Sequence, residues 1–140
     1  MKAAVIYESL TGNTRTAATY IAAELERAGV PATVSAVTAI DYQALAEADL
    51  VVVGSWTDGL FVVGQRPGRA GRLRRLPFVS GKRCAVYCTY AIDPGKTLDK
   101  LVAIMEDRGA EVLGGMAIRR DDLAGGSREF VGRVLDVVNA

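Results

Sequence analysis

A short polar run near the N-terminus holds the residues with the clearest capacity for chemistry. The run reads Ser9, Leu10, Thr11, Gly12, Asn13 and Thr14. Its hydroxyl and amide groups are neutral hydrogen-bond donors, and its glycine permits a tight backbone turn. Where such a run leads into a helix, free backbone N–H groups and the helix dipole favour an anion. The run, called the first loop below, is therefore a candidate anion-binding loop.

The donors of the first loop indicate which anion it would take. The loop contains no lysine, so it differs from the Gly-Lys-Ser/Thr loop that cradles nucleotide phosphates. Neutral donors alone suit a phosphate monoester carried on a larger ligand. A plain polar turn, in which Thr11 or Asn13 caps the helix, is the alternative interpretation.

A second polar segment, the second loop, contains the only tryptophan of the chain. It reads Ser55, Trp56, Thr57, Asp58 and Gly59. A large flat side chain at a sheet edge can stack on a planar ring, although Trp56 taken alone fits a cap on the core equally well. An apolar run follows, and we expect it to cover a ligand or form an interface; it comprises Leu60, Phe61, Val62 and Val63.

A third segment, the third loop, offers another aromatic side chain. It contains Thr89, Tyr90, Ala91 and Asp93. By itself Tyr90 fits a half-buried core tyrosine, but together with Trp56 it would form the second wall of a slot for a planar ring. Two aromatic walls beside a phosphate cradle describe a site for flavin mononucleotide (FMN).

The surrounding sequence alternates between strand-like and helix-like segments, which brings these loops together. Apolar, β-rich runs predict strands over residues 3–7, 32–37, 50–54, 83–88 and 111–118. Helical spacing predicts helices over residues 13–28, 41–48, 69–76 and 97–108, and a last helix capped by Ser127. The alternation predicts an α/β three-layer sandwich with a five-stranded parallel sheet in the order 2-1-3-4-5. The three loops then converge at the carboxyl edge of the sheet, where such folds bind ligands.

The composition fits one domain spanning residues 1–140. Half of the residues are hydrophobic and 24% are charged, so extensive disorder is not expected. No apolar run approaches the roughly 20 residues needed to cross a bilayer, and the N-terminal run is too short for a signal peptide. We therefore expect a cytoplasmic protein without membrane insertion.

Two residue types limit the chemistry that the chain can perform. It contains no histidine, the commonest general base and metal ligand. Cys84 and Cys88 lie in one predicted strand, whose rise of about 3.3 Å per residue sets them roughly 13 Å apart. A disulfide needs Cα atoms within about 7 Å, so we expect none and interpret Cys84 as a core residue. Any chemistry must use other groups or a bound cofactor.

Basic residues are concentrated in one segment although the net charge is only +1. Residues 66–83, the basic segment, contain no acidic residue. Their basic residues are Arg66, Arg69, Arg72, Arg74, Arg75, Lys82 and Arg83. The segment is either a solvated surface or a docking patch for an acidic or phosphate-bearing partner, and nucleic acid is not expected.

The first loop resembles the phosphate signature of the flavodoxin family, Ser/Thr-x-Thr-Gly-x-Thr. The resemblance covers the whole chain through the order of strands and helices and the short length. It implies a flavodoxin-like fold, bound FMN and electron transfer with protein partners, a reductase and an acceptor. By position, the first loop would hold the phosphate and Trp56 and Tyr90 would flank the isoalloxazine. Residues 57–59 would meet the flavin N5, and residues 89–93 would face the pyrimidine edge.

The sequence also departs from this family at three points. Flavodoxins are strongly acidic around the flavin, whereas this chain is near neutral and has the basic segment. The apolar run after Gly59 is unusual beside a flavin. Cys88, Thr89 and Tyr90 replace the acidic Gly-Asp signature of short flavodoxins. We expect fewer acids around the flavin to destabilise its reduced anion less than usual.

Three classes of function follow. The leading one is a carrier that shuttles single electrons between redox partners. The alternative is an FMN-dependent reductase acting on a quinone or NAD(P)H, although such enzymes resemble longer chains with an added dimerisation loop. The third is a flavin-free interaction module. A response-regulator receiver domain is disfavoured, because Gly54, Ser55 and Trp56 stand where it needs a phosphoacceptor aspartate.

Overall fold

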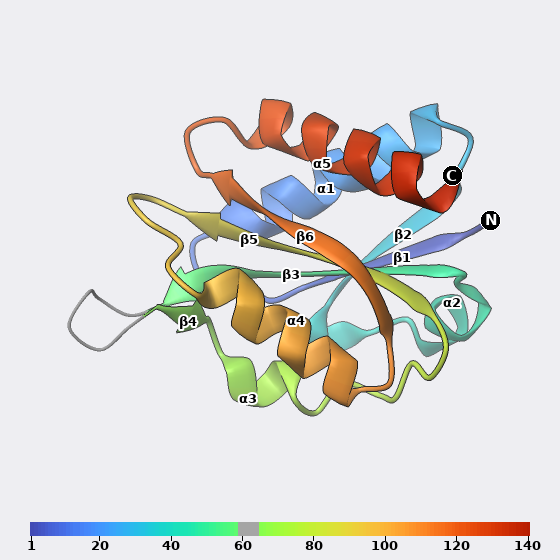
Figure 1. The fold of residues 1–140 in the computed structure, drawn as a ribbon, viewed down its shortest axis with the longest axis horizontal. Helices are drawn as coiled ribbons and strands as arrows, with labels where there is room; N and C mark the ends of the chain where they lie inside the picture. The colour runs from blue at the N-terminus through green and yellow to red at the C-terminus, as the bar shows by residue number, and fades with distance from the viewer. Residues whose placement is uncertain (59–64) are drawn as a thin grey trace.

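A parallel sheet lies between two layers of helices in the computed structural model, which describes residues 1–58 and 65–140 (Figure 1). The strands are β1 (Ala3–Tyr7), β2 (Ala32–Ala36), β3 (Leu50–Asp58), β4 (Arg66–Pro67), β5 (Arg83–Tyr90) and β6 (Glu111–Arg119). The helices are α1 (Asn13–Arg27), α2 (Tyr42–Glu47), α3 (Ala70–Leu73), α4 (Thr97–Asp107) and α5 (Leu123–Val138), with a 3-10 turn η1 over Val37–Ala39. Within the described residues, no helix has the length and hydrophobicity to cross a membrane.

The order of the strands brings the three loops to one edge of the sheet. The order is β2-β1-β3-β5-β6, and each neighbouring pair along it is parallel. This confirms the predicted order 2-1-3-4-5, because the short β4 is an addition that lies off this path and pairs with β3. At the carboxyl edge, Tyr7 of β1 pairs with Gly54 of β3, and Trp56 of β3 pairs with Thr89 of β5. The three loops therefore begin on adjacent strands.

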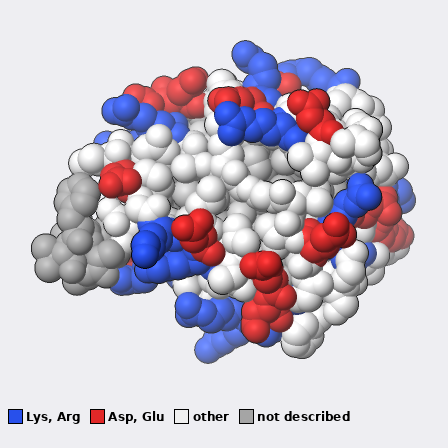
Figure 2. All heavy atoms as spheres, in the orientation of Figure 1, with Lys and Arg blue, Asp and Glu red and all other residues white. Residues whose placement is uncertain are grey.

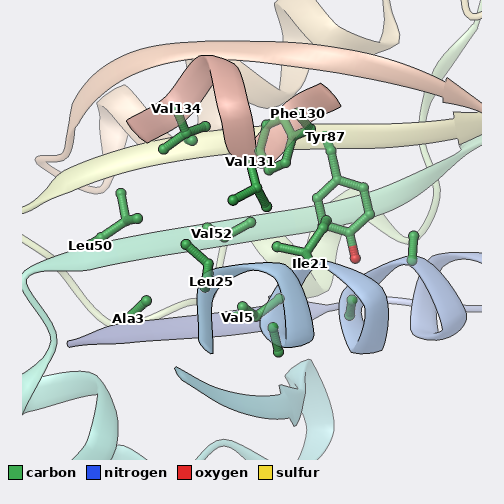
Figure 3. Packing of buried hydrophobic residues seen from close by; sticks show 14 of the residues in the cluster. Ala3, Val5, Ile21, Leu25, Leu50, Val52, Tyr87, Phe130, Val131 and Val134 are labelled. Atoms are coloured by element: carbon green, nitrogen blue, oxygen red, sulfur yellow. The ribbon is translucent and has the colours of Figure 1, made fainter. Parts of the chain in front are cut away.

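Both faces of the sheet are covered by helices. The helices α1 and α5 lie over one face, and α2, α3 and α4 lie over the other (Figure 1). Under α1 and α5, Ile21, Tyr87 and Phe130 meet in one apolar cluster, and the rings of the latter two have centroids 5.9 Å apart (Figure 3). Leu73 of α3 and Leu101 of α4 belong to the second cluster. Burial on both sides explains why β3 begins as an unbroken apolar run.

The segment after β3 is the part of the fold that differs most from the sequence prediction. β3 was expected to end at Gly54 but continues to Asp58, because Thr57 and Asp58 pair antiparallel with Pro67 and Arg66 of β4. The helix expected over residues 69–76 is confined to Ala70–Leu73. The apolar run 60–63, expected to cover a ligand or form an interface, lies outside the described residues.

The last helix begins earlier than the sequence indicates, so the prediction that Ser127 caps it is wrong. Asp122 is the cap, and its Oδ1 accepts a hydrogen bond from the Gly125 N–H at 3.2 Å. Ser127 is buried inside the helix, and its hydroxyl donates to the Ala17 carbonyl at 3.5 Å. The two glycines of the first turn are poor helix formers. Gly126 is nevertheless required, since a Cβ there would lie 2.6 Å from Ile118 Cγ2.

Candidate functional site

The first loop leads from β1 into α1 and leaves the start of that helix open. Gly12 stands at the N-cap with φ 97°, a conformation that favours glycine, and its N–H donates to Ser9 Oγ at 3.1 Å. Among the described residues, no side chain caps α1, and its first turn holds no acidic residue. The alternative in which Thr11 or Asn13 caps the helix is therefore wrong. The first N–H groups and the positive end of the dipole therefore remain available to an anion.

The side chains of the first loop differ in exposure. Leu10 and Thr11 are exposed, Ser9, Gly12 and Asn13 are half-buried, and Thr14 is buried. The Thr14 hydroxyl lies 3.1 Å from the Thr89 hydroxyl, and the Tyr87 hydroxyl donates to the Thr14 carbonyl at 2.8 Å. Thr14 therefore joins the first loop to the third.

The second loop is anchored to the segment that follows β4. The Ser55 hydroxyl is buried and donates to the Gly68 carbonyl at 2.9 Å. This hydrogen bond links β3 to the residue that follows β4. The buried Thr57 Oγ1 has no hydrogen-bond partner among the described residues. Asp58 forms an ion pair with Arg66 at 3.6 Å. Gly59, also expected in the site, lies outside the described residues.

Trp56 lies half-buried at the carboxyl edge, packed on the chain that follows β4. A Cβ on Gly68 would come within 2.0 Å of Trp56 Cε2, so only glycine lets the indole lie this close to the backbone. The Arg69 Cζ lies 5.5 Å from the centroid of the Trp56 ring, within the range of a cation–π contact. Gly68 and Arg69 of the same chain therefore fix the position of the Trp56 indole.

The third loop begins in the core and ends in solvent. Thr89 is buried, Tyr90 and Ala91 are half-buried, and Asp93 is exposed. Asp93 Oδ1 accepts a hydrogen bond from the Gly95 N–H at 2.9 Å, so this carboxylate shapes the turn. A Cβ on Gly95 would lie 2.3 Å from Gln65 Oε1, which places the residue before β4 directly against this loop.

Three charged residues that the sequence analysis did not assign to the site lie between the first two loops. Glu8, directly before the first loop, is buried, and its Oε1 accepts hydrogen bonds from Nη1 of Arg69 at 3.0 Å and of Arg72 at 3.3 Å. Glu8 Oε2 has no partner among the described residues. The sequence gives only a weak indication of this cluster. Glu8 is a single acidic residue after a predicted strand, and Arg69 and Arg72 are two of the seven basic residues in the basic segment.

Both cysteines of the chain are buried in β5. Burial raises the pKa of the Cys84 and Cys88 thiols to about 12, so both stay protonated at neutral pH. The described residues contain no cluster of three potential metal ligands. The uncapped start of α1 and an indole fixed at the edge fit a phosphorylated ligand with a planar ring. FMN has this chemistry.

Comparisons with known proteins agree with this geometry. A family model described as a flavodoxin domain matches residues 4–117. A mutant flavodoxin from Pseudomonas aeruginosa is 15% identical, with a TM-score of 0.76 and 100% of both chains covered. The two-electron-reduced flavodoxin of Megasphaera elsdenii is 22% identical, with a TM-score of 0.72 and 99% of both chains covered. No curated protein matches the sequence.

The fold also occurs as part of larger proteins. The rubredoxin oxygen:oxidoreductase of Desulfovibrio gigas is 16% identical, and the match, with a TM-score of 0.66, covers 99% of this chain and 37% of that one. The fold and the loops define an α/β protein with a candidate ligand site at the carboxyl edge of its parallel sheet. The family match over most of the chain shows that it belongs to the flavodoxin family, whose members bind FMN and transfer electrons.

Proposed function

We propose that this protein binds FMN and shuttles single electrons between redox partners. The observation that carries the proposal is the uncapped N-terminus of α1, which begins directly after Gly12. The loop that leads to it follows β1, and β1 is adjacent to β3, the strand that contains Trp56. This arrangement offers backbone donors to a phosphate and an aromatic wall to a ring in one continuous edge. Membership of the flavodoxin family supports the same cofactor.

In this proposal each of the three loops contacts a different part of the cofactor. The first loop holds the phosphate through the α1 backbone and the polar side chains of Ser9, Thr11, Asn13 and Thr14. Trp56 and Tyr90 flank the isoalloxazine, while Thr57, Asp58 and Gly59 meet one edge of the ring. Thr89, Ala91 and Asp93 lie toward the other edge.

Bound FMN supplies the redox chemistry, and the chain binds, orients and shields it. The first loop fixes the phosphate end without a cationic side chain of its own. Trp56 is immobilised against Gly68, so it can exclude water from one side of the ring without reorganisation. Because the buried thiols stay protonated and the chain has no histidine, the redox chemistry would come from FMN rather than from these side chains.

A flavin titration tests the proposal directly. Purified apoprotein is titrated with FMN while Trp56 fluorescence and the visible flavin bands are followed. Strong quenching with FMN and much weaker binding of riboflavin, which lacks the phosphate, is the expected result. No quenching and no flavin bands would refute FMN binding.

Steady-state kinetics then separate a carrier from an FMN-dependent oxidoreductase. The holoprotein is mixed with NADH or NADPH and a quinone, and cofactor oxidation is followed. A carrier shows almost no turnover until a flavoprotein reductase is added. Turnover by the holoprotein alone would favour the oxidoreductase.

The basic segment forms a candidate docking surface for an acidic redox partner. Arg66, Arg69 and Arg74, together with Lys100 of α4, line a hollow of about 540 Å³ that also contains Asp58 of the second loop. Lys and Arg side chains gather over β4 and α3 at the lower left of Figure 2, whereas a largely uncharged band crosses the middle of that face. Opposite charge on a partner would speed encounter and orient it toward the flavin edge.

A further inference from the structure

Arg69 has an unusual backbone conformation. With φ 48° and ψ 46° it is the one non-glycine residue with positive φ in the part of the chain that the structure describes. Side-chain-bearing residues disfavour this left-handed region, and such conformations persist where the surroundings fix them, often at functional sites. The contacts that fix Arg69 are therefore informative.

Two contacts from different loops hold the Arg69 side chain. Its Nη1 donates to Glu8 Oε1 at 3.0 Å, and its Cζ lies 5.5 Å from the centroid of the Trp56 ring. Glu8 immediately precedes the first loop, and Trp56 is the proposed wall of the ring slot. Arg69 therefore bridges the phosphate end and the ring end of the proposed FMN site.

The cluster keeps unused hydrogen-bonding capacity and a net positive charge. The Glu8 side chain is 4% exposed, so its charge is largely removed from water, while the Arg69 side chain is 41% exposed. One carboxylate faces the guanidiniums of Arg69 and Arg72, which leaves one positive charge in excess. A guanidinium carries five N–H donors, and the Glu8 bond uses only one from Arg69.

We propose that Arg69 is an electrostatic residue of the FMN site, held beside the flavin ring by Glu8 and Trp56. Its charge stabilises the reduced, anionic flavin relative to the oxidised, neutral ring. A charge that is already fixed where negative charge develops acts without reorganisation, and partial burial strengthens its effect. The inference rests on the proposed FMN binding and assigns a tuning role to residues that the phosphate cradle does not include.

The test compares Arg69→Gln with Arg133→Gln in the FMN-loaded protein. Arg133 is a matched control because it also pairs with a glutamate, Glu129, but lies on α5 over the opposite face of the sheet. Midpoint potentials report the affinity for reduced relative to oxidised FMN. We expect Arg69→Gln to lower that ratio about tenfold, equivalent to about 30 mV for a two-electron couple. Arg133→Gln should leave it unchanged.

Two further variants separate charge from a purely structural role. Glu8→Gln removes the opposing negative charge and should raise the midpoint potential, opposite in sign to the effect of Arg69→Gln. Arg69→Lys keeps the charge and should restore most of the wild-type potential. If Arg69→Gln does not fold, a raised potential in Glu8→Gln beside a nearly unchanged potential in Arg69→Lys still supports the proposal, and an unchanged potential in Glu8→Gln overturns it.

The outcomes distinguish this inference from the function on which it rests. If the wild-type protein does not bind FMN, the proposed function and the inference fail together. If it binds FMN but Arg69→Gln and Arg133→Gln give the same potential, only the inference is overturned. A loss of potential in Arg69→Lys as large as in Arg69→Gln would also overturn it, because charge would then not be the cause.

Discussion

Thr11 and Thr14 carry the same side chain in different surroundings, so the same substitution should affect them differently. Thr11 is exposed, and Thr11→Ala would remove one of the proposed donors to the phosphate. A hydrogen bond to a charged group contributes about 1.5–3 kcal/mol, so the FMN dissociation constant should rise about 10- to 100-fold. Riboflavin affinity and the melting temperature should not change.

Thr14→Ala is the matched variant for this measurement. It leaves the buried Thr89 hydroxyl without its 3.1 Å partner, so it should lower both FMN affinity and thermal stability. Flavin fluorescence titrations and thermal melts of both variants provide the readouts. An equal loss of FMN and riboflavin affinity in Thr11→Ala would contradict the phosphate assignment.

The buried thiols predict how stability depends on alkaline pH. Burial raises the pKa of Cys84 and Cys88 from 9.0 to about 12. The unfolded chain loses these protons above pH 9 while the folded chain retains them. The stabilisation is therefore complete below pH 9 and is lost as the pH rises toward 12, by up to about 1.4 kcal/mol per pH unit for each thiol.

Urea unfolding between pH 8 and roughly pH 10 measures this slope. Cys84→Ala should be less stable at every pH, because it leaves a cavity in the core, but its stability should fall less steeply with pH. A slope in Cys84→Ala as steep as in the wild-type protein would show that the thiol does not contribute.

At the scale of the elements, α5 contains two glycines with opposite expected responses to alanine. A Cβ at Gly126 would lie 2.6 Å from Ile118 Cγ2, whereas a Cβ at Gly132 meets nothing within 4 Å. Gly126→Ala should destabilise the protein by about 1–3 kcal/mol through overpacking. Gly132→Ala should stabilise it by about 0.5–1 kcal/mol through helix propensity. Urea unfolding of the two variants measures both, and stabilisation by Gly126→Ala would refute the close packing of α5 on β6.

The same helix shows what local sequence patterns convey and what they miss. The periodicity around Phe130 predicts a helix. The packing that requires a glycine at position 126 involves Ile118 of β6, so it is not visible in the local pattern. The first loop was predictable because Gly12 and the residues that it positions are consecutive. The Glu8–Arg69 pair joins residues 61 positions apart, so only the folded arrangement of β1, β4 and α3 reveals it.

At the scale of the whole molecule, the basic segment and the candidate flavin edge lie on the same side of the fold. Asp58 of the second loop lines the hollow that Arg66 and Arg74 also line. A positive field at this edge would favour negatively charged electron acceptors. Most flavodoxins are acidic around the flavin and so favour basic partners. The basic surface of this chain would instead favour acidic partners.

Electron transfer from the reduced holoprotein to small complexes of opposite charge tests this field. Ferricyanide, an anion, should react faster at low ionic strength, whereas hexaamminecobalt(III), a cation, should react more slowly than at high ionic strength. Arg74→Glu combined with Lys100→Glu should slow ferricyanide about tenfold and speed the cation. Arg128→Glu combined with Arg133→Glu makes the same change in net charge on α5, over the opposite face, and should change neither rate. Both double variants must keep their flavin absorption, so that lost FMN is not mistaken for lost steering. Identical responses in the two double variants would show that net charge, rather than this surface, governs the encounter.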